Sequence, residues 1–318
     1  MKRKLSDAFM EDLQTGILQS LRECVSSDDT LMLAIRRDYV NIYYRGGSIL
    51  KLEEQGKSYK ATFDSNYTSV GTTPLPELPQ KISSSEDIKV WVDNFPVLKQ
   101  IMDRWFFEKS KAEREFQQLV VRENNYSPIS NETEYFIADI ELADSNVGAR
   151  FDMLAIKWPA QARKSGEVHL ALLEMKYGDG ALTNESGVTE HLRQLHECLG
   201  NQETRKSLCK MAEGQINQLN QLGLLRHKKG EARAFFVDEN SLEVIFLFVN
   251  HNPRSPKLLT ELEAIETQLK SIQTTIPFAL RFFIASSAGY AMHDACMVSI
   301  DEYLEFLRKQ AKKVPHIR

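Results

Sequence analysis

The sequence predicts an α/β protein of the α+β type, with a mixed central sheet flanked by helices and a smaller N-terminal unit before it. Three observations lead to this class. Runs rich in β-branched and aromatic residues occupy residues 31–64 and 135–177, and such runs favour strands. Around them, apolar residues recur at helical spacing. A proline-rich stretch, Thr72–Pro79, separates the two strand-rich parts and has the character of a linker.

Length and composition are those of a globular protein with about two domains. The chain has 318 residues, of which 42% are hydrophobic and 26% charged, enough apolar material for a sizeable core. We therefore expect an N-terminal accessory unit over residues 1–80 and a larger domain over residues 81–318. The formal charge of −4 argues against a generally basic surface but permits a local basic groove.

Targeting signals and cysteine usage indicate a cytoplasmic protein. No apolar run reaches the length of a membrane span, and the basic N-terminus lacks the apolar segment of a signal peptide. The four cysteines form no C-x-x-C pair and have no zinc spacing, so we expect reduced thiols.

The N-terminal unit is expected to contain one helix and an antiparallel β-meander. Ser6 is a candidate N-cap for a helix over residues 6–25, and turns are expected at Gly46-Gly47 and at residues 55–57. Basic residues alternate with tyrosines in this meander, a pattern typical of either a nucleic-acid surface or an ordinary solvated sheet face. They are Arg36, Arg37, Arg45, Lys51, Lys57 and Lys60, with Tyr39, Tyr43, Tyr44 and Tyr59. Partner binding and homodimer formation are open alternatives for this unit.

Helices are expected on both sides of the second strand-rich run. Ser84 or Ser85 caps a helix, and Pro96 is expected to start another that continues to about Glu123. After residue 187, apolar residues again recur at helical spacing, and 203–223 is a further helix. Later segments read as a buried strand, a helix, another strand and a final helix capped by Ser299.

Charged residues interrupt the second strand-rich run in a way that packing does not require. Asp152 lies within the apolar strand ARFDMLAIKW, and Glu174 and Lys176 end the strand VHLALLEMKYG. Because side chains two apart share a face of a strand, Leu170, Leu172, Glu174 and Lys176 project together. A row that changes from leucine to charge at the carboxyl end of a strand indicates a pocket. The alternative is an edge strand whose Glu and Lys form a solvent-exposed cross-strand pair.

This arrangement resembles the PD-(D/E)XK, or restriction-endonuclease-like, nuclease superfamily. Asp152 matches the aspartate of the family's second strand, and Glu174-Met175-Lys176 matches its E-x-K. Phe151 stands where the motif's proline would be. The resemblance covers about residues 110–286 and implies a core made of a helix, a three-stranded meander, a second helix and a further strand.

The resemblance also implies a metal-dependent phosphodiesterase. Asp152, Glu174 and the carbonyl of Met175 would hold one or two Mg²⁺ ions, with Mn²⁺ as a substitute, since Mg²⁺ takes one or two carboxylates together with waters and phosphate oxygens. Lys176 would orient the attacking water or stabilise charge on phosphorus. The expected substrate is nucleic acid, with DNA favoured, and the expected setting is restriction, repair or phage defence.

Several further residues are open candidates. Many relatives carry a glutamate on the helix before the meander, and the sequence does not separate Glu113 from Glu115. Asp139 or Glu141 on the first strand, and His191 or Gln194 on the helix after E-x-K, are second-rank candidates. Residues 203–233 are rich in lysine and arginine, which fits either phosphate contact or a solvated loop. The alternatives to a nuclease are a catalytically inactive module that binds nucleic acid or a protein, and a protein that acts by contact alone.

Overall fold

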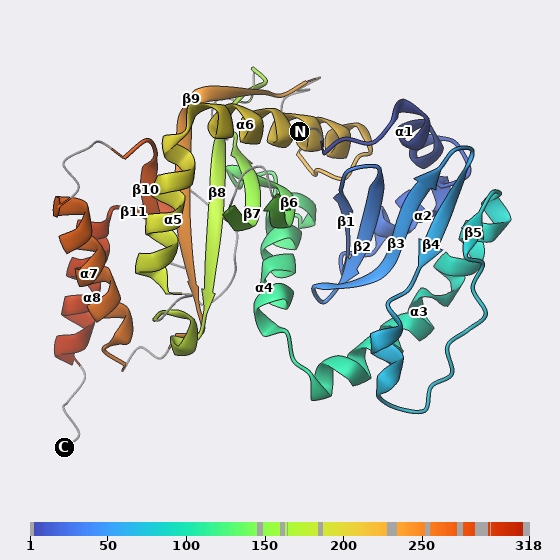
Figure 1. Cartoon of the computed structure of the whole chain (residues 1–318), viewed down its shortest axis with the longest axis horizontal. Coiled ribbons are helices and arrows are strands. Elements are labelled where there is room, and N and C mark those ends of the chain that lie inside the picture. Colours follow the sequence, from blue (N-terminus) through green and yellow to red (C-terminus); the bar gives the residue numbers. More distant parts are fainter. Residues whose placement is uncertain are drawn as a thin grey trace.

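The computed structural model contains two β-sheets joined by helices (Figure 1). It describes residues 3–144, 149–159, 163, 165–183, 187–227, 234–251, 255–271, 276–283, 292 and 294–313. The sequence-based class is confirmed: a five-stranded antiparallel sheet comes first, and a six-stranded mixed sheet with helices follows. No helix in these ranges combines the length and apolarity needed to cross a membrane.

The first sheet has the strand order β1-β2-β3-β4-β5. Its strands are β1 (Leu31–Ile35), β2 (Tyr39–Tyr44), β3 (Gly47–Gln55), β4 (Ser58–Thr62) and β5 (Lys81–Ile82). The expected turns are present, with Arg45 and Gly46 at the centre of the first and Gly56 in the second. A 3₁₀ turn, η1 (Ser65–Ser69), lies between β4 and β5.

The single N-terminal helix that periodicity predicts is two helices instead. They are α1 (Asp7–Gln14), capped by Ser6 as expected, and α2 (Gln19–Ser27). The helical conformation is interrupted at Thr15-Gly16, where the Asp12 carboxylate accepts a hydrogen bond from the Ile17 amide. Such a local side-chain bond offers the backbone an alternative to the helix.

Helix α3 (Ser85–Glu108) belongs with the first sheet. Ser84 caps it, in a capping box with Asp87. The expected new helix at Pro96 is wrong, because Pro96 lies inside α3, and the expected continuation to Glu123 is interrupted after Glu108. Strand β5 pairs with β4, and α3 packs on α2 and β3. The division expected at residue 80 therefore falls between two paired strands.

The second sheet has the order β11-β10-β9-β8-β7-β6. Strands β6, β7 and β8 form the expected antiparallel meander, β9 and β10 run parallel to β8, and β11 is antiparallel to β10. The bounds are β6 (Tyr135–Asp144), β7 (Ala149–Lys157), β8 (Glu167–Tyr177), β9 (Phe236–Val249), β10 (Ala279–Phe283) and β11 (Met297–Val298). Strand β8 is buried along most of its length, because it lies between β7 and β9 and helices α4 (Ala112–Val121) and α6 (Gln202–Gln221) pack on it.

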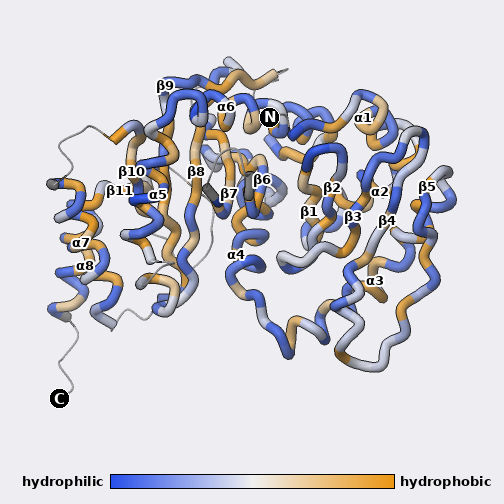
Figure 2. The backbone as a smooth tube through the Cα atoms, in the orientation of Figure 1, coloured by the Kyte–Doolittle hydropathy of each residue, from blue (hydrophilic) through white to orange (hydrophobic). Residues whose placement is uncertain are grey.

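Helices enclose this sheet. They are α4 (Ala112–Val121), which continues as the π-turn η2 (Arg122–Tyr126), α5 (Val188–Gly200), α6 (Gln202–Gln221), α7 (Lys257–Ser271) and α8 (Ile300–Lys313), with short 3₁₀ turns η4 (Asp179–Ala181) and η6 (Asp294–Cys296). Helix α4 packs on β6 and β8, α6 on β6, β7 and β9, and α8 on β10. Hydrophobic residues gather along the strands of both sheets and alternate with hydrophilic ones along the helices (Figure 2). In chain order, helix α4, the meander, helices α5 and α6 and strand β9 follow one another.

Candidate active site

Three carboxylates stand in one row across the meander. Met153 pairs with Leu173, so the next residues along, Asp152 and Glu174, face each other across β7 and β8. On the other side, Ile140 pairs with Met153 and Leu142 with Phe151, which places Glu141 opposite Asp152. Directly opposed residues on neighbouring strands have adjacent side chains. The two strand tips therefore bring Asp152 and Glu174 together, as the sequence predicts, with Glu141 beside them.

At Asp152 a side-chain hydrogen bond continues the backbone hydrogen bonds that join β7 and β8. Its Oδ2 accepts a hydrogen bond of 2.7 Å from the Met175 amide, taking the place of a backbone carbonyl. In an extended residue the amide and carbonyl point toward the same neighbouring strand. The carbonyl of Met175 is thus directed to the same side as its amide, toward Asp152.

Glu174 is buried, and two neighbouring side chains contact its carboxylate. Its carboxylate lies 2.9 Å from Lys176 Nζ and also contacts His191 Nδ1, and Lys176 and His191 are 3.1 Å apart. Burial acts to raise the pKa of Glu174, but the bond to His191 and the charge of Lys176 outweigh it, so the pKa lies below its usual value. Glu174 therefore keeps its negative charge to lower pH than an ordinary glutamate.

The influences on the pKa of Asp152 add up in the opposite direction. Burial is the largest influence on its carboxyl and raises its pKa well above the usual value, and the nearby charge of Glu174 raises it further. The hydrogen bond from Met175 and the charge of Lys176 act against this shift without cancelling it. Opposed carboxylates with divergent pKa values are a feature of functional sites, although structural networks also produce them.

The structure separates the two helix glutamates. Glu113 faces the row: burial raises its pKa, and the charges of Lys176 and Glu174 both act on it. Glu115 points to the N-terminal sheet, where it forms a two-pronged ion pair with Arg45 at 2.8 and 3.1 Å. Glu113 is thus the helix residue that belongs to the site.

The other second-rank candidates divide in the same way. His191 joins the site through Glu174 and Lys176, whereas Gln194 is exposed and donates a hydrogen bond to Glu190. Glu141 joins the carboxylate row, whereas Asp139 is fully buried and paired with arginines away from it. A β-bulge near Ala138 and a left-handed Glu141, with φ of 53°, end the simple alternation that puts these two acids on one face.

The row forms the floor of a cavity of about 830 Å³. Glu113, Glu141, Asp152, Glu174 and His191 line it together with three cations, Lys111, Arg114 and Arg150. Sequence analysis did not identify these cations as part of the site. Spacing contains the signal for two of them: Arg150 is two residues before Asp152 on one strand, and Lys111 is three residues before Arg114 at the start of α4.

The donor set suits a hard divalent cation. Asp152 and Glu174 offer carboxylate oxygens, Met175 a carbonyl, and the charge on buried Asp152 is poorly compensated. In the described residues, no three His, Cys, Asp or Glu side chains are already gathered as a metal site. Mg²⁺ requires fewer protein ligands than that, because it keeps several waters and takes one or two carboxylates.

The basic residues of the N-terminal meander, for which a nucleic-acid surface and an ordinary sheet face were the alternatives, divide between internal contacts and solvent: Arg37, Lys57 and Lys60 are exposed. Arg36 pairs with Asp139, Arg45 with Asp103 and Glu115, and Lys51 with Glu53. The Tyr59 hydroxyl donates a hydrogen bond to Asp12. In the basic stretch 203–233, α6 is confirmed, and residues 228–233 lie outside the described part of the chain.

Comparisons with known proteins return no relative for this chain. No family model, no curated protein and no solved structure matches it.

Proposed function

We propose that this protein is a metal-dependent nuclease that hydrolyses phosphodiester bonds, with Mg²⁺ as the cofactor and Mn²⁺ as a substitute. The observation that carries the proposal is the pairing of Asp152, a partly buried carboxylate whose charge Lys176 compensates only in part, with an opposed Glu174 that is held by Lys176. A buried carboxylate without compensation is costly to the fold. A divalent cation bound between the strand tips would remove that cost, so the arrangement supports a cation site.

Each residue has a separate role in this proposal. Asp152, Glu174 and the Met175 carbonyl hold the cation, which when bound acidifies a water and polarises a phosphate oxygen. Lys176 is buried and donates to Glu174 in the resting site; in this proposal it would also donate to the attacking water or to charge that develops on phosphorus. His191 shares Glu174 with Lys176 and so orients both. Glu113 closes the opposite wall.

The cation-lined cavity supports a polyanionic substrate. Lys111 and Arg150 are exposed where they line the cavity, and Arg114 is partly exposed. Lysine and arginine contacts to phosphates position a nucleic-acid strand without reading its sequence. An acidic floor among basic residues therefore fits a phosphodiester backbone whose scissile phosphate meets the cation. DNA remains the favoured substrate.

A catalytically inactive module that binds nucleic acid or a protein partner is the alternative. One observation favours it: the Glu174 carboxylate already pairs with Lys176 and contacts His191. A site with this carboxylate permanently neutralised would keep the fold and the basic cavity but bind Mg²⁺ poorly.

The test is cleavage of plasmid, linear duplex, single-stranded DNA and RNA, each with Mg²⁺, Mn²⁺ or chelator. We expect metal-dependent cleavage that Asp152→Ala and Lys176→Ala each reduce by about 10²-fold or more, the cost of removing one transition-state contact. Asp93→Ala, at an exposed position of α3, is the control and should cleave normally. Full activity in either site variant would disprove the mechanism, and nucleic-acid binding without cleavage would favour the inactive module.

A further inference from the structure

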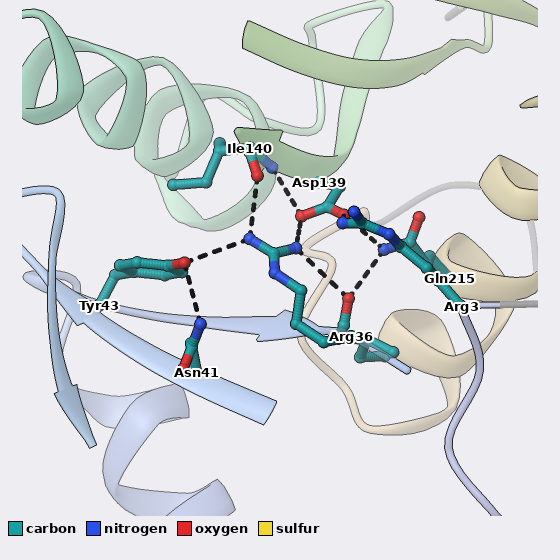
Figure 3. Close-up of polar contacts among 8 residues, drawn as sticks. Arg3, Arg36, Asn41, Tyr43, Asp139, Ile140 and Gln215 are labelled. Carbon is teal, nitrogen blue, oxygen red and sulfur yellow. Dashed lines mark hydrogen bonds and ion pairs between the residues drawn. The ribbon is translucent and has the colours of Figure 1, made fainter. Parts of the chain in front are cut away.

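The N-terminal sheet reaches the candidate site at two points, and the first is Arg36, directly after β1. Its guanidinium pairs with the buried carboxylate of Asp139 and donates a 2.9 Å hydrogen bond to the carbonyl of Ile140 (Figure 3). Arg3 and Gln215 each donate to the same Asp139 oxygen at 2.8 Å. Ile140 immediately precedes Glu141, the left-handed residue that lines the cavity. The sheet thus holds β6 beside the carboxylate row.

The second point is the β2–β3 turn, which lies on α4. Arg45 pairs with Glu115 and Asp103, and the Gly46 amide donates a 2.7 Å hydrogen bond to Gln118. A Cβ atom at Gly46 would lie only 2.5 Å from the backbone carbon of Arg114. Only glycine permits so close an approach of two backbones. The turn therefore seats directly against the residue that follows Glu113.

The two anchored elements meet at the cavity wall. Arg114 of α4 pairs with Glu141 of β6 at 2.6 Å, and Glu113 lies beside them on the wall. We propose that the N-terminal sheet is a positioning element of the active site, in which Arg45 and Gly46 set α4, and Arg36 sets β6, so that Glu113, Arg114 and Glu141 face Asp152 and Glu174.

The proposal rests on the proposed function for its catalytic consequence but not for its structural one. A separate recognition unit would be joined to the core by a linker and a polar, hydrated interface. Here the contacts are a backbone-to-backbone approach at Gly46 and an arginine that is 5% exposed at Arg36. Such contacts transmit a displacement of the sheet to the wall, because packed interiors do not deform freely.

Two glycines of the same sheet give a matched experiment. Gly46 and Gly56 both occupy turns at positive φ, 73° and 65°, but a Cβ at Gly56 meets nothing within 4 Å. Gly46→Ala and Gly56→Ala therefore share the backbone strain, and only Gly46→Ala pushes on α4. Hydrogen–deuterium exchange over residues 112–121 reports local opening of α4, and kcat and KM with Mg²⁺ report the site.

We expect Gly46→Ala to raise exchange in α4 and to lower kcat at least 10-fold, with Gly56→Ala close to wild type in both. Equal exchange in the two variants would overturn the proposal whether or not the wild type cleaves, so an inert wild type would refute only the proposed function. Equal kcat values in an active enzyme would also overturn it.

If Gly46→Ala fails to fold, Arg45→Ala and Arg45→Lys replace it, with Lys51→Ala as the control because Lys51 pairs within the sheet. Lys51→Ala should keep the wild-type kcat. Partial recovery of kcat in Arg45→Lys relative to Arg45→Ala is the expected result. Wild-type kcat and α4 exchange in Arg45→Ala would overturn the proposal.

Discussion

Asp139 and Asp152 lie on neighbouring strands of one sheet but have opposite surroundings. Asp139 is fully buried, and Arg3, Arg36 and Gln215 surround its carboxylate. Asp152 accepts one backbone hydrogen bond and faces two further acids, Glu141 and Glu174, across a cavity. Asp139 is thus a buried charge that neighbouring protein groups compensate. Asp152 is a charge that its protein neighbours leave largely uncompensated.

This difference distinguishes an acid that stabilises the fold from an acid at a functional site. A buried charge that is paired and hydrogen-bonded on all sides serves the fold, and removing it leaves its partners unpaired. A buried charge among like charges destabilises the fold and persists where function requires it. Residue type does not separate the two, because both are aspartates in apolar strands. Their surroundings do: Asp139 is fully buried among cations, and Asp152 is partly buried at the cavity.

The largest expected effect is on Asp139. Asp139→Asn should lower the free energy of unfolding by about 3–5 kcal/mol, because breaking a buried ion pair leaves charges without partners. Chemical denaturation at neutral pH measures it, with exposed Asp93→Asn as the control. If Asp139→Asn lowers the free energy of unfolding no more than the control does, Asp139 does not stabilise the fold and the contrast with Asp152 is wrong.

Substitution of Asp152 should raise the free energy of unfolding, whereas substitution of Asp139 lowers it. Asp152→Asn removes an uncompensated charge, so at pH 7 it should stabilise the fold by more than the ~0.5 kcal/mol typical of surface changes. The folded-state pKa of Asp152 is raised, so the native state binds more protons and wild-type stability falls as pH rises from about 4, the usual aspartate pKa, through that raised value. Below about pH 4 the variant should have no advantage. A destabilised variant at pH 7 would contradict this assignment.

Divalent metal should abolish the difference between wild type and Asp152→Asn. Binding to the native state alone stabilises by an amount that grows with concentration, about 2.7 kcal/mol at 100 times Kd. We expect Mg²⁺ and Mn²⁺ to raise the melting temperature of the wild type and of Asp93→Asn, a control that keeps Asp152, but not of Asp152→Asn. A metal-induced shift of equal size in Asp152→Asn would locate the cation elsewhere.

The smallest expected effects are at the cavity cations. Lys111→Ala and Arg150→Ala should each weaken nucleic-acid binding uniformly across sequences and reduce the slope of log affinity against log salt by about 0.7–0.9, the value for one phosphate contact. Lys89→Ala, at an exposed lysine on α3, is the matched control. Unchanged slopes in both cavity variants would mean that substrate enters by another route.

Much of the local structure follows from local chemistry. The meander at Tyr135–Tyr177 was predictable because alternation, turn residues and apolar runs agree there, and the capping serines Ser6 and Ser84 act where expected. Local signals were misleading at Pro96 and at Thr15-Gly16. Proline normally begins a helix, and an unbroken apolar period normally means one helix, but packing and a side-chain bond decided otherwise.

The order of residues is enough to show that Asp152 lies within one apolar strand and that Glu174 and Lys176 end another, where a period of two puts them on one face. Only the tertiary structure decided that Glu113 and not Glu115 faces them, that Glu141 joins their row and Asp139 does not, and that the N-terminal sheet supports the wall. The reason is physical: one helix turn offers both glutamates to different neighbours, and the left-handed backbone at Glu141 breaks the alternation that would put it on the same face as Asp139. Which neighbour is present depends on strands and turns far away in the chain.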